Sequence, residues 1–122
     1  MHRLILFSTL LLFTATSFSQ TAELTGRIWH ISEDQMAGVG KHEPLPEGTT
    51  LEFRADGTWT TSAPLRGATT GTWVRSGDGE LRMTFGDDAK SRPIKLLVLT
   101  TNELRFRFGN VKATYTYTWK AG

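Results

Sequence analysis

The sequence of 122 residues predicts an all-β protein, an eight-stranded antiparallel up-and-down barrel that follows a signal peptide. Apolar and polar residues alternate with a period of two along most of the chain, and turn-forming residues separate the alternating segments. β-Branched and aromatic residues dominate these segments, as is typical of strands. A meander of this many strands would have two exposed edges unless it closed, so we expect a closed barrel.

Residues 1–19 have the pattern of a secretory signal peptide. Met1-His2-Arg3 is a basic start, an apolar run follows, and Ser17 and Ser19 place small residues before a cleavage site. The alternative is a transmembrane anchor, but the apolar run has only about half the length that a membrane-spanning helix needs. We therefore expect a mature domain of residues 20–122 that is periplasmic or secreted, with no stable membrane anchor.

The composition excludes several classes of function. The absence of cysteine excludes disulfide scaffolds, cysteine-ligated metal sites, thiol nucleophiles and a lipid-modified N-terminal cysteine. The net charge is +2, and no run of basic residues could follow a phosphate backbone. We therefore expect no nucleic-acid partner.

The first four strands are expected at residues 24–32, 49–54, 58–62 and 71–75. Asp56-Gly57 between the second and third strands is a strong signal for a tight hairpin.

The last four strands are expected at residues 80–86, 92–99, 103–108 and 113–120. Residues 103–108 alternate without a break, and the last strand places its aromatic residues on one face and its threonines on the other. Asp87-Asp88 is expected to form a turn. Residues 94–99 are apolar on both faces, so the outer face should be covered by the N-terminal segment or, alternatively, by a partner.

Two connections are expected to be irregular. Residues 33–48 are rich in glycine, proline and charged residues, and only residues 34–37 could form a helical turn. Long irregular connections in compact domains are often functional. Residues 63–70 are expected to form a shorter flexible loop.

The inward-facing side chains of the strands are the candidate ligand-binding residues. They are Phe53, Trp59, Trp73, Met83, Phe85, Phe106, Phe108, Tyr115, Tyr117 and Trp119. Either these side chains simply fill the barrel, or they line a pocket for a small apolar ligand that enters beneath residues 33–48. The two tyrosines would add hydroxyl groups that orient the ligand.

No motif for catalysis, phosphate binding or dinucleotide binding is present, so we expect no enzyme, no catalytic residue and no cofactor. His30 is interpreted as a surface or packing residue. His42 and Glu43 could join Glu33 and Asp34 in a metal site, but a solvated acidic loop explains them better. No metal site is therefore predicted.

Several segments resemble small exported lipocalin-like proteins of Bacteroidetes-type bacteria. They are residues 45–59, Gly71-Thr72-Trp73 and residues 77–81. The Gly-x-Trp hallmark of the lipocalin first strand has here one extra residue, in Gly26-Arg27-Ile28-Trp29. Either a bulge at Gly26 returns Trp29 to the barrel floor, or Trp29 is not the family tryptophan. Lys120 would stand for the basic residue that packs over it. The resemblance implies a barrel that binds a small apolar ligand or is kept only as a scaffold.

Two functions of different classes follow. The first is an exported lipocalin-like binding protein that holds a small apolar ligand in the barrel. The alternative is a protein-interaction module, such as a β-barrel inhibitor of a secreted protease or hydrolase, in which Gln20 to Leu24 would project freely. A monomer is expected in either case.

Overall fold

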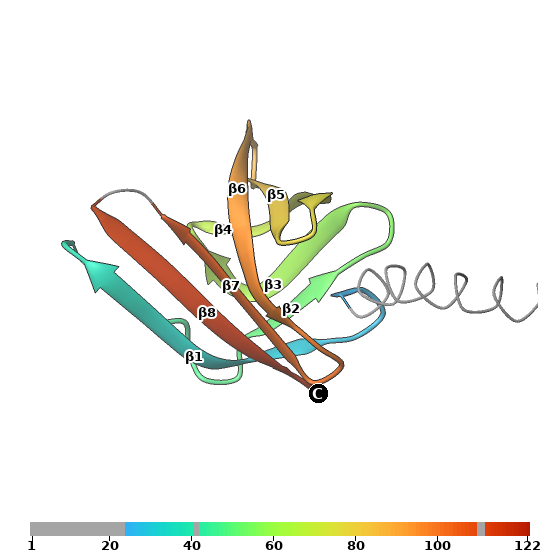
Figure 1. Ribbon diagram of the computed structural model, residues 1–122, viewed down its shortest axis with the longest axis horizontal. Coiled ribbons are helices and arrows are strands. Elements are labelled where there is room, and N and C mark those ends of the chain that lie inside the picture. Colours follow the sequence, from blue (N-terminus) through green and yellow to red (C-terminus); the bar gives the residue numbers. More distant parts are fainter. Residues whose placement is uncertain (1–23, 41, 110–111) are drawn as a thin grey trace, which may run out of the picture.

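The computed structural model describes residues 24–40, 42–109 and 112–122 and confirms the predicted fold class. Eight antiparallel strands pair in chain order and form a closed barrel (Figure 1). They are β1 (Trp29–Gly38), β2 (Thr50–Phe53), β3 (Thr58–Leu65), β4 (Ala68–Gly77), β5 (Glu80–Phe85), β6 (Asp88–Leu99), β7 (Glu103–Gly109) and β8 (Ala113–Ala121). The predicted signal peptide, residues 1–19, lies outside the described residues. Among the residues that are described, no helix is long and apolar enough to cross a membrane.

The pairing of β1 with β8 closes the barrel. It runs antiparallel from Trp29 opposite Ala121 to Gly38 opposite Ala113, with one bulge between Ile31 and Glu33. By contrast, β1 pairs with the short β2 only at Trp29 and His30. The part of β1 beyond His30 therefore has a strand neighbour on one side alone.

This difference gives the barrel two unlike ends. We call the closed end the one that contains the β2–β3, β4–β5 and β6–β7 turns and residues 24–28. The open end contains the β3–β4, β5–β6 and β7–β8 connections and the end of β1, and the strands fan out toward it in Figure 1. The connection from β1 to β2 returns from the open end and lies beside the unpaired part of β1, where the Ile31 amide donates to the Thr49 carbonyl oxygen at 2.9 Å.

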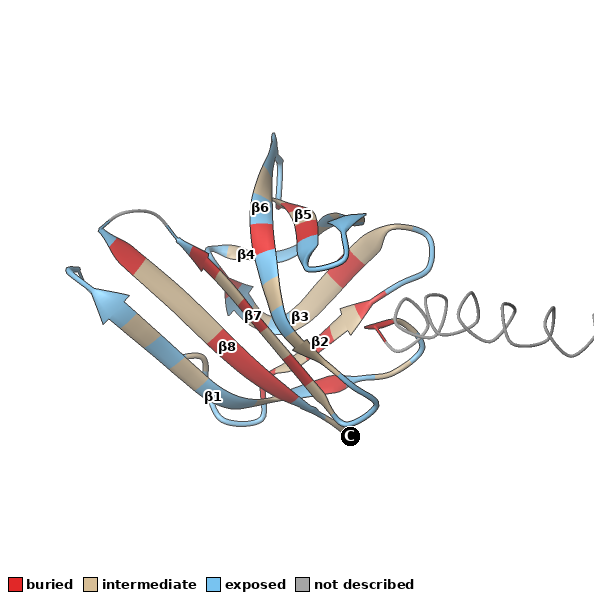
Figure 2. Cartoon of the chain, viewed as in Figure 1, coloured by how far each residue is buried: buried red, intermediate tan, exposed pale blue. Residues whose placement is uncertain are grey.

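Large apolar side chains fill the closed end. The fully buried ones include Leu24, Trp29, Leu51, Phe53, Trp59, Leu81, Met83, Leu104, Phe106 and Trp119. Buried positions alternate with less buried ones along β5 and β7, as a two-residue period requires (Figure 2). Burial of this much apolar surface supplies most of the stability of a domain that has no disulfide bond.

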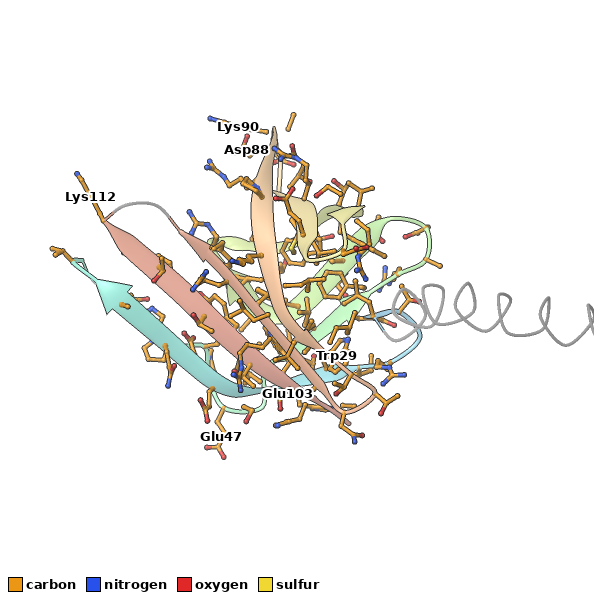
Figure 3. The ribbon with its side chains drawn as sticks, viewed as in Figure 1. Trp29, Glu47, Asp88, Lys90, Glu103 and Lys112 are labelled. Carbon is orange, nitrogen blue, oxygen red and sulfur yellow. The ribbon has the colours of Figure 1, made fainter. Side chains whose placement is uncertain are left out.

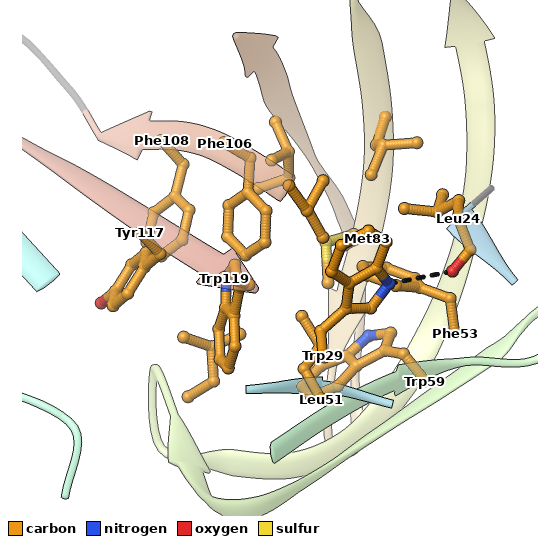
Figure 4. Close-up of a cluster of buried hydrophobic side chains, with 14 of the residues drawn as sticks. Leu24, Trp29, Leu51, Phe53, Trp59, Met83, Phe106, Phe108, Tyr117 and Trp119 are labelled. Carbon is orange, nitrogen blue, oxygen red and sulfur yellow. Dashed lines mark hydrogen bonds between the residues drawn. The ribbon is translucent and has the colours of Figure 1, made fainter. Parts of the chain in front are cut away.

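Residues 24–28 close the floor of the barrel instead of starting the first strand. The indole N–H of Trp29 donates to the Leu24 carbonyl oxygen at 3.1 Å (Figure 4), and Thr25 forms a single parallel bridge with Phe53. Leu24 is fully buried. The alternative function required a free segment from Gln20 to Leu24. Its last residue is instead packed into the core, and residues 20–23 lie outside the described chain.

Trp29 is fully buried at the barrel floor, as one of the two alternatives for this residue required, but Lys120 does not cover it. Gly26 precedes β1 and has a left-handed φ of 75°, so it forms no strand bulge, and the bulge of β1 lies instead between Ile31 and Glu33. The guanidinium of Arg27 lies 5.4 Å from the centre of the Trp29 ring. Lys120 is exposed and places its ammonium 2.7 Å from a Glu103 carboxylate oxygen. The cation over the tryptophan is therefore Arg27 and not the expected Lys120.

The first predicted strand and the connection after it were wrongly placed. The strand was expected at 24–32 but runs from Trp29 to Gly38, so the first part of the expected irregular segment 33–48 is strand. Residues 34–37, which were expected to allow a helical turn, pair with β8. The glycine and charged residues give this segment a low strand propensity, but its pairing with β8 outweighs that propensity.

The loop expected at 63–70 is a tight hairpin. β3 continues to Leu65 and β4 starts at Ala68. Arg66 and Gly67 between them both have positive φ, 52° and 82°, which is the pattern of a two-residue type I′ turn. Asp88 likewise belongs to β6 and not to a turn with Asp87. Most of the other predicted strand boundaries agree with the structure to within one or two residues.

The outer face of β6 is only partly covered. Leu97 is 39% exposed, so no described segment covers it fully. The predicted covering segment begins at residue 20, and its residues 20–23 lie outside the described chain.

Gly71 provides a test of core packing. The indole of Trp59 passes over Gly71 on β4 and donates to the Thr84 carbonyl oxygen of β5 at 2.9 Å. A Cβ at Gly71 would overlap that oxygen and lie 2.6 Å from the indole nitrogen. We predict that Gly71→Ala lowers the free energy of unfolding by about 2 kcal/mol or more, measured by urea denaturation.

Gly77→Ala is the matched control. Gly77 lies on the same strand, has no positive φ, and a Cβ there would meet no atom within 4 Å. Its effect on unfolding should stay within roughly 0.5 kcal/mol. Equal effects of the two substitutions would contradict this account of the Trp59 packing.

Candidate functional site

Two adjoining pockets lie at the open end of the barrel, with volumes of about 380 and 480 Å³. Arg66 and Tyr115 line both. The first, the β6–β8 pocket, lies between the start of β6 and the β7–β8 connection and is lined by residues that include Phe85, Ile94, Phe108 and Tyr115. The second, the β1 pocket, lies beside the β1–β2 connection and is lined by residues that include His42, Leu45, Pro64 and Tyr117.

Cross-strand pairing assembles the aromatic wall of these pockets. Phe108 of β7 lies opposite Tyr115 of β8, and their ring centres are 6.0 Å apart. Phe108 also stacks with Tyr117 at 5.4 Å and contacts the Phe85 ring at 6.2 Å. Successive inward positions on neighbouring strands therefore form one continuous surface of rings.

The structure divides the ten predicted ligand-binding residues into two groups. Phe85, Phe108, Tyr115 and Tyr117 line the pockets. The six that line neither of these two pockets are Phe53, Trp59, Trp73, Met83, Phe106 and Trp119. All of these except the half-buried Trp73 are fully buried in the core. The side chains thus fill the barrel interior at the closed end, and the two pockets lie toward the open end.

Four cationic residues at the β6–β8 pocket were not recognised from the sequence. Arg66, Lys90, Arg92 and Lys112 line it, and they come from three separate connections or strand starts. Figure 3 shows Lys90 at the tip of β6 and Lys112 beside the start of β8, far from Trp29 and Glu103 at the closed end. No sequence motif links these positions, because only closure of the barrel brings them together.

Arg66 is the cation closest to the rings. Its guanidinium carbon lies 4.6 Å from the centre of the Phe108 ring and 6.0 Å from that of Tyr115. These distances are within the range of cation–π attraction. Arg66 is also the only residue other than glycine with positive φ in the described chain. The turn therefore holds this side chain over the wall of the pocket at some cost in backbone strain.

Asp34 and His42 fix the β1–β2 connection against the barrel. Nε2 of His42 lies 2.6 Å from one carboxylate oxygen of Asp34, and the other accepts the Leu45 amide at 2.7 Å. The Asp34 side chain is only 6% exposed. The His42 ring also contacts the Tyr115 ring at 5.5 Å. These contacts hold the connection at one side of the β1 pocket.

Of the histidines and acidic residues considered as metal ligands, only one pair comes together in the described chain. Asp34 and His42 meet, but the described residues contain no group of three side chains that could hold a metal ion. His30 is exposed on β1 near the closed end. We find no geometric reason to assign it to the pockets.

The Tyr117 hydroxyl is held in its neutral form. Burial raises its pKa to about 12, the Asp34 carboxylate and Tyr115 add to the rise, and the Arg66 charge opposes it. At neutral pH Tyr117 can therefore donate a hydrogen bond to a bound molecule at the inner surface of the β1 pocket.

The sequence matches no protein-family model, and no curated protein shows significant similarity to it. The arguments about function therefore rest on the fold and on the geometry of the open end.

The Tyr117 pKa gives a prediction for alkaline pH. Because the folded-state pKa is raised above the ordinary value of 10, the neutral form stabilises the fold fully below pH 10, and this contribution is lost as the pH rises toward 12. A spectrophotometric titration should show one of the two tyrosines ionising close to pH 12 in the folded state. In Tyr117→Phe this late transition should disappear. Its persistence would contradict the assignment.

Proposed function

We propose that this protein is an exported, lipocalin-like binding protein, periplasmic or secreted, that holds a small apolar ligand in the open end of its barrel. The observation that carries the proposal is the pair of adjoining pockets of about 380 and 480 Å³ with a shared aromatic wall. These volumes fall within the range of sites for small molecules, which are concave and lined mainly by apolar and aromatic groups. The role is binding and not catalysis.

The division of the interior supports this proposal. The rings at the closed end are fully buried and give a rigid floor, so the pockets above need no large rearrangement to exist. The rings of Phe85, Phe108 and Tyr115 offer flat apolar surface to a ligand. Tyr117 and His42 add a few polar groups in the β1 pocket, which is the usual way that such sites orient their ligands.

The proposal is tested with the mature protein in two ways. Native mass spectrometry of protein purified gently from its own host should show a stoichiometric small-molecule adduct. The neutral apolar dye N-phenyl-1-naphthylamine should bind the ligand-free protein and gain fluorescence. We expect Tyr115→Ala to weaken dye binding about tenfold, because this ring lines both pockets.

Thr116→Ala is the control for this experiment. Thr116 is the neighbouring residue on β8 and lines neither pocket. Its substitution should leave dye affinity unchanged. A mass without adduct together with no dye binding would overturn the proposal.

A further inference from the structure

We propose that the ligand is an amphipathic anion, with an acidic head group bound by the cations of the β6–β8 pocket and an apolar body against the aromatic wall. This inference rests on the proposed function and specifies its ligand class. It is carried by the charges that converge on this pocket.

Among the described residues that line the β6–β8 pocket, several are cationic and none is acidic. Arg66, Lys90, Arg92 and Lys112 all line it. Arg92 forms an ion pair with Asp88, whose carboxylate lies 3.5 Å from its guanidinium. Both partners are about half exposed, and such surface pairs are weak and easily exchanged for another anion. The four cations therefore create a positive potential that favours a negatively charged group.

Arg66 is placed to bind that group directly. It has no ion pair or hydrogen bond with any other residue of the described chain. Its contacts are with the faces of the Phe108 and Tyr115 rings, which leave the N–H groups at the edge of the guanidinium available. A planar guanidinium with free N–H groups suits two-point binding of a carboxylate or phosphate.

The same pocket also contains apolar surface, which indicates that its ligand has an apolar part as well as a charged one. Phe85, Ile94 and Phe108 line it together with the cations. Ile94 is fully buried, and the two phenylalanines keep only a small exposed part, so this apolar surface forms the inner side of the pocket. A ligand that satisfies both surfaces has an acidic head at the solvent side and an apolar body that points into the barrel.

The charge distribution also assigns the orientation of the ligand across the two pockets. The β1 pocket is lined by Glu43 and lies beside the buried Asp34 carboxylate. Arg66 is shared by both pockets, but a negative head group in the β1 pocket would also meet these carboxylates, whereas the β6–β8 pocket adds three more cations. The head group is therefore placed at the β6–β8 side, and the apolar body or any hydroxyl group extends toward Tyr117.

The test compares ligands that share one tail and differ in head group. We would measure affinities of the mature protein for dodecanoate, dodecyl phosphate, dodecanol and dodecylammonium by displacement of N-phenyl-1-naphthylamine at pH 7.5. Dodecanoate should bind roughly tenfold more tightly than dodecanol, and dodecylammonium should bind most weakly. The preference for the anion should shrink between about 0.05 and 0.5 M salt, as expected for partly exposed charges. Dodecyl phosphate should likewise bind more tightly than dodecanol, because its head group is also an anion.

Arg66→Asn is the decisive variant. Asparagine suits the left-handed conformation of the turn, so the variant keeps the hairpin while it removes the guanidinium. It should lower dodecanoate affinity roughly tenfold and leave dodecanol affinity within about twofold of the original protein. Arg54→Gln is the control, because it removes one exposed cation at the closed end.

The outcomes separate the two proposals. Equal binding of dodecanoate and dodecanol, or an unchanged preference in Arg66→Asn, overturns the anionic head group and leaves the apolar pocket in place. An equal loss in Arg54→Gln also overturns it, because the effect would then be one of net charge. Absence of binding by all four amphiphiles and by the dye overturns both proposals.

Discussion

The shortness of β2 is the constraint on which the rest of the structure depends. β1 has ten residues and pairs along its length with β8, but the four-residue β2 can pair with it only at Trp29 and His30. The sheet therefore closes tightly at one end and spreads at the other. The β1–β2 connection, fastened through Asp34 and His42, takes the place of the missing strand length. A longer β2 would cover the side of the barrel where the β1 pocket now lies.

The two ends consequently have different physical roles. At the closed end, packed aromatic rings and the Trp29–Leu24 hydrogen bond provide stability and leave little free volume. At the open end, rings of the same kind are exposed at their edges and are joined by Arg66 and the other cations. The inward alternation that builds a core at the closed end thus builds the aromatic wall of the pockets at the open end. The difference lies in whether other side chains cover the rings.

Patterns among neighbouring residues were enough to predict the closed barrel. Features that depend on contacts between residues far apart in the sequence could not be predicted. The Asp56-Gly57 turn and the alternation in residues 103–108 are properties of a few neighbouring residues, and the structure has them as expected. The strand over residues 33–38 could not be foreseen, because it depends on pairing with β8 far along the chain. The same holds for Arg66, which the sequence placed in a flexible loop. Its position over the pocket wall depends on contact with the Phe108 ring. Phe108 lies on β7, which does not pair with either strand of the Arg66 turn.

The most direct test of the account is the location of a bound ligand on the protein. The four tryptophans give separate indole N–H signals in a two-dimensional NMR spectrum, and backbone amides report on the open end. On titration with dodecanoate, we predict shifts of the amides of Arg66, Phe108 and Tyr115, with the indole signals of Trp29 and Trp59 unchanged. Shifts that centre on those two indoles, or that spread over the outside of the barrel, would contradict the claim that the open end is the binding site.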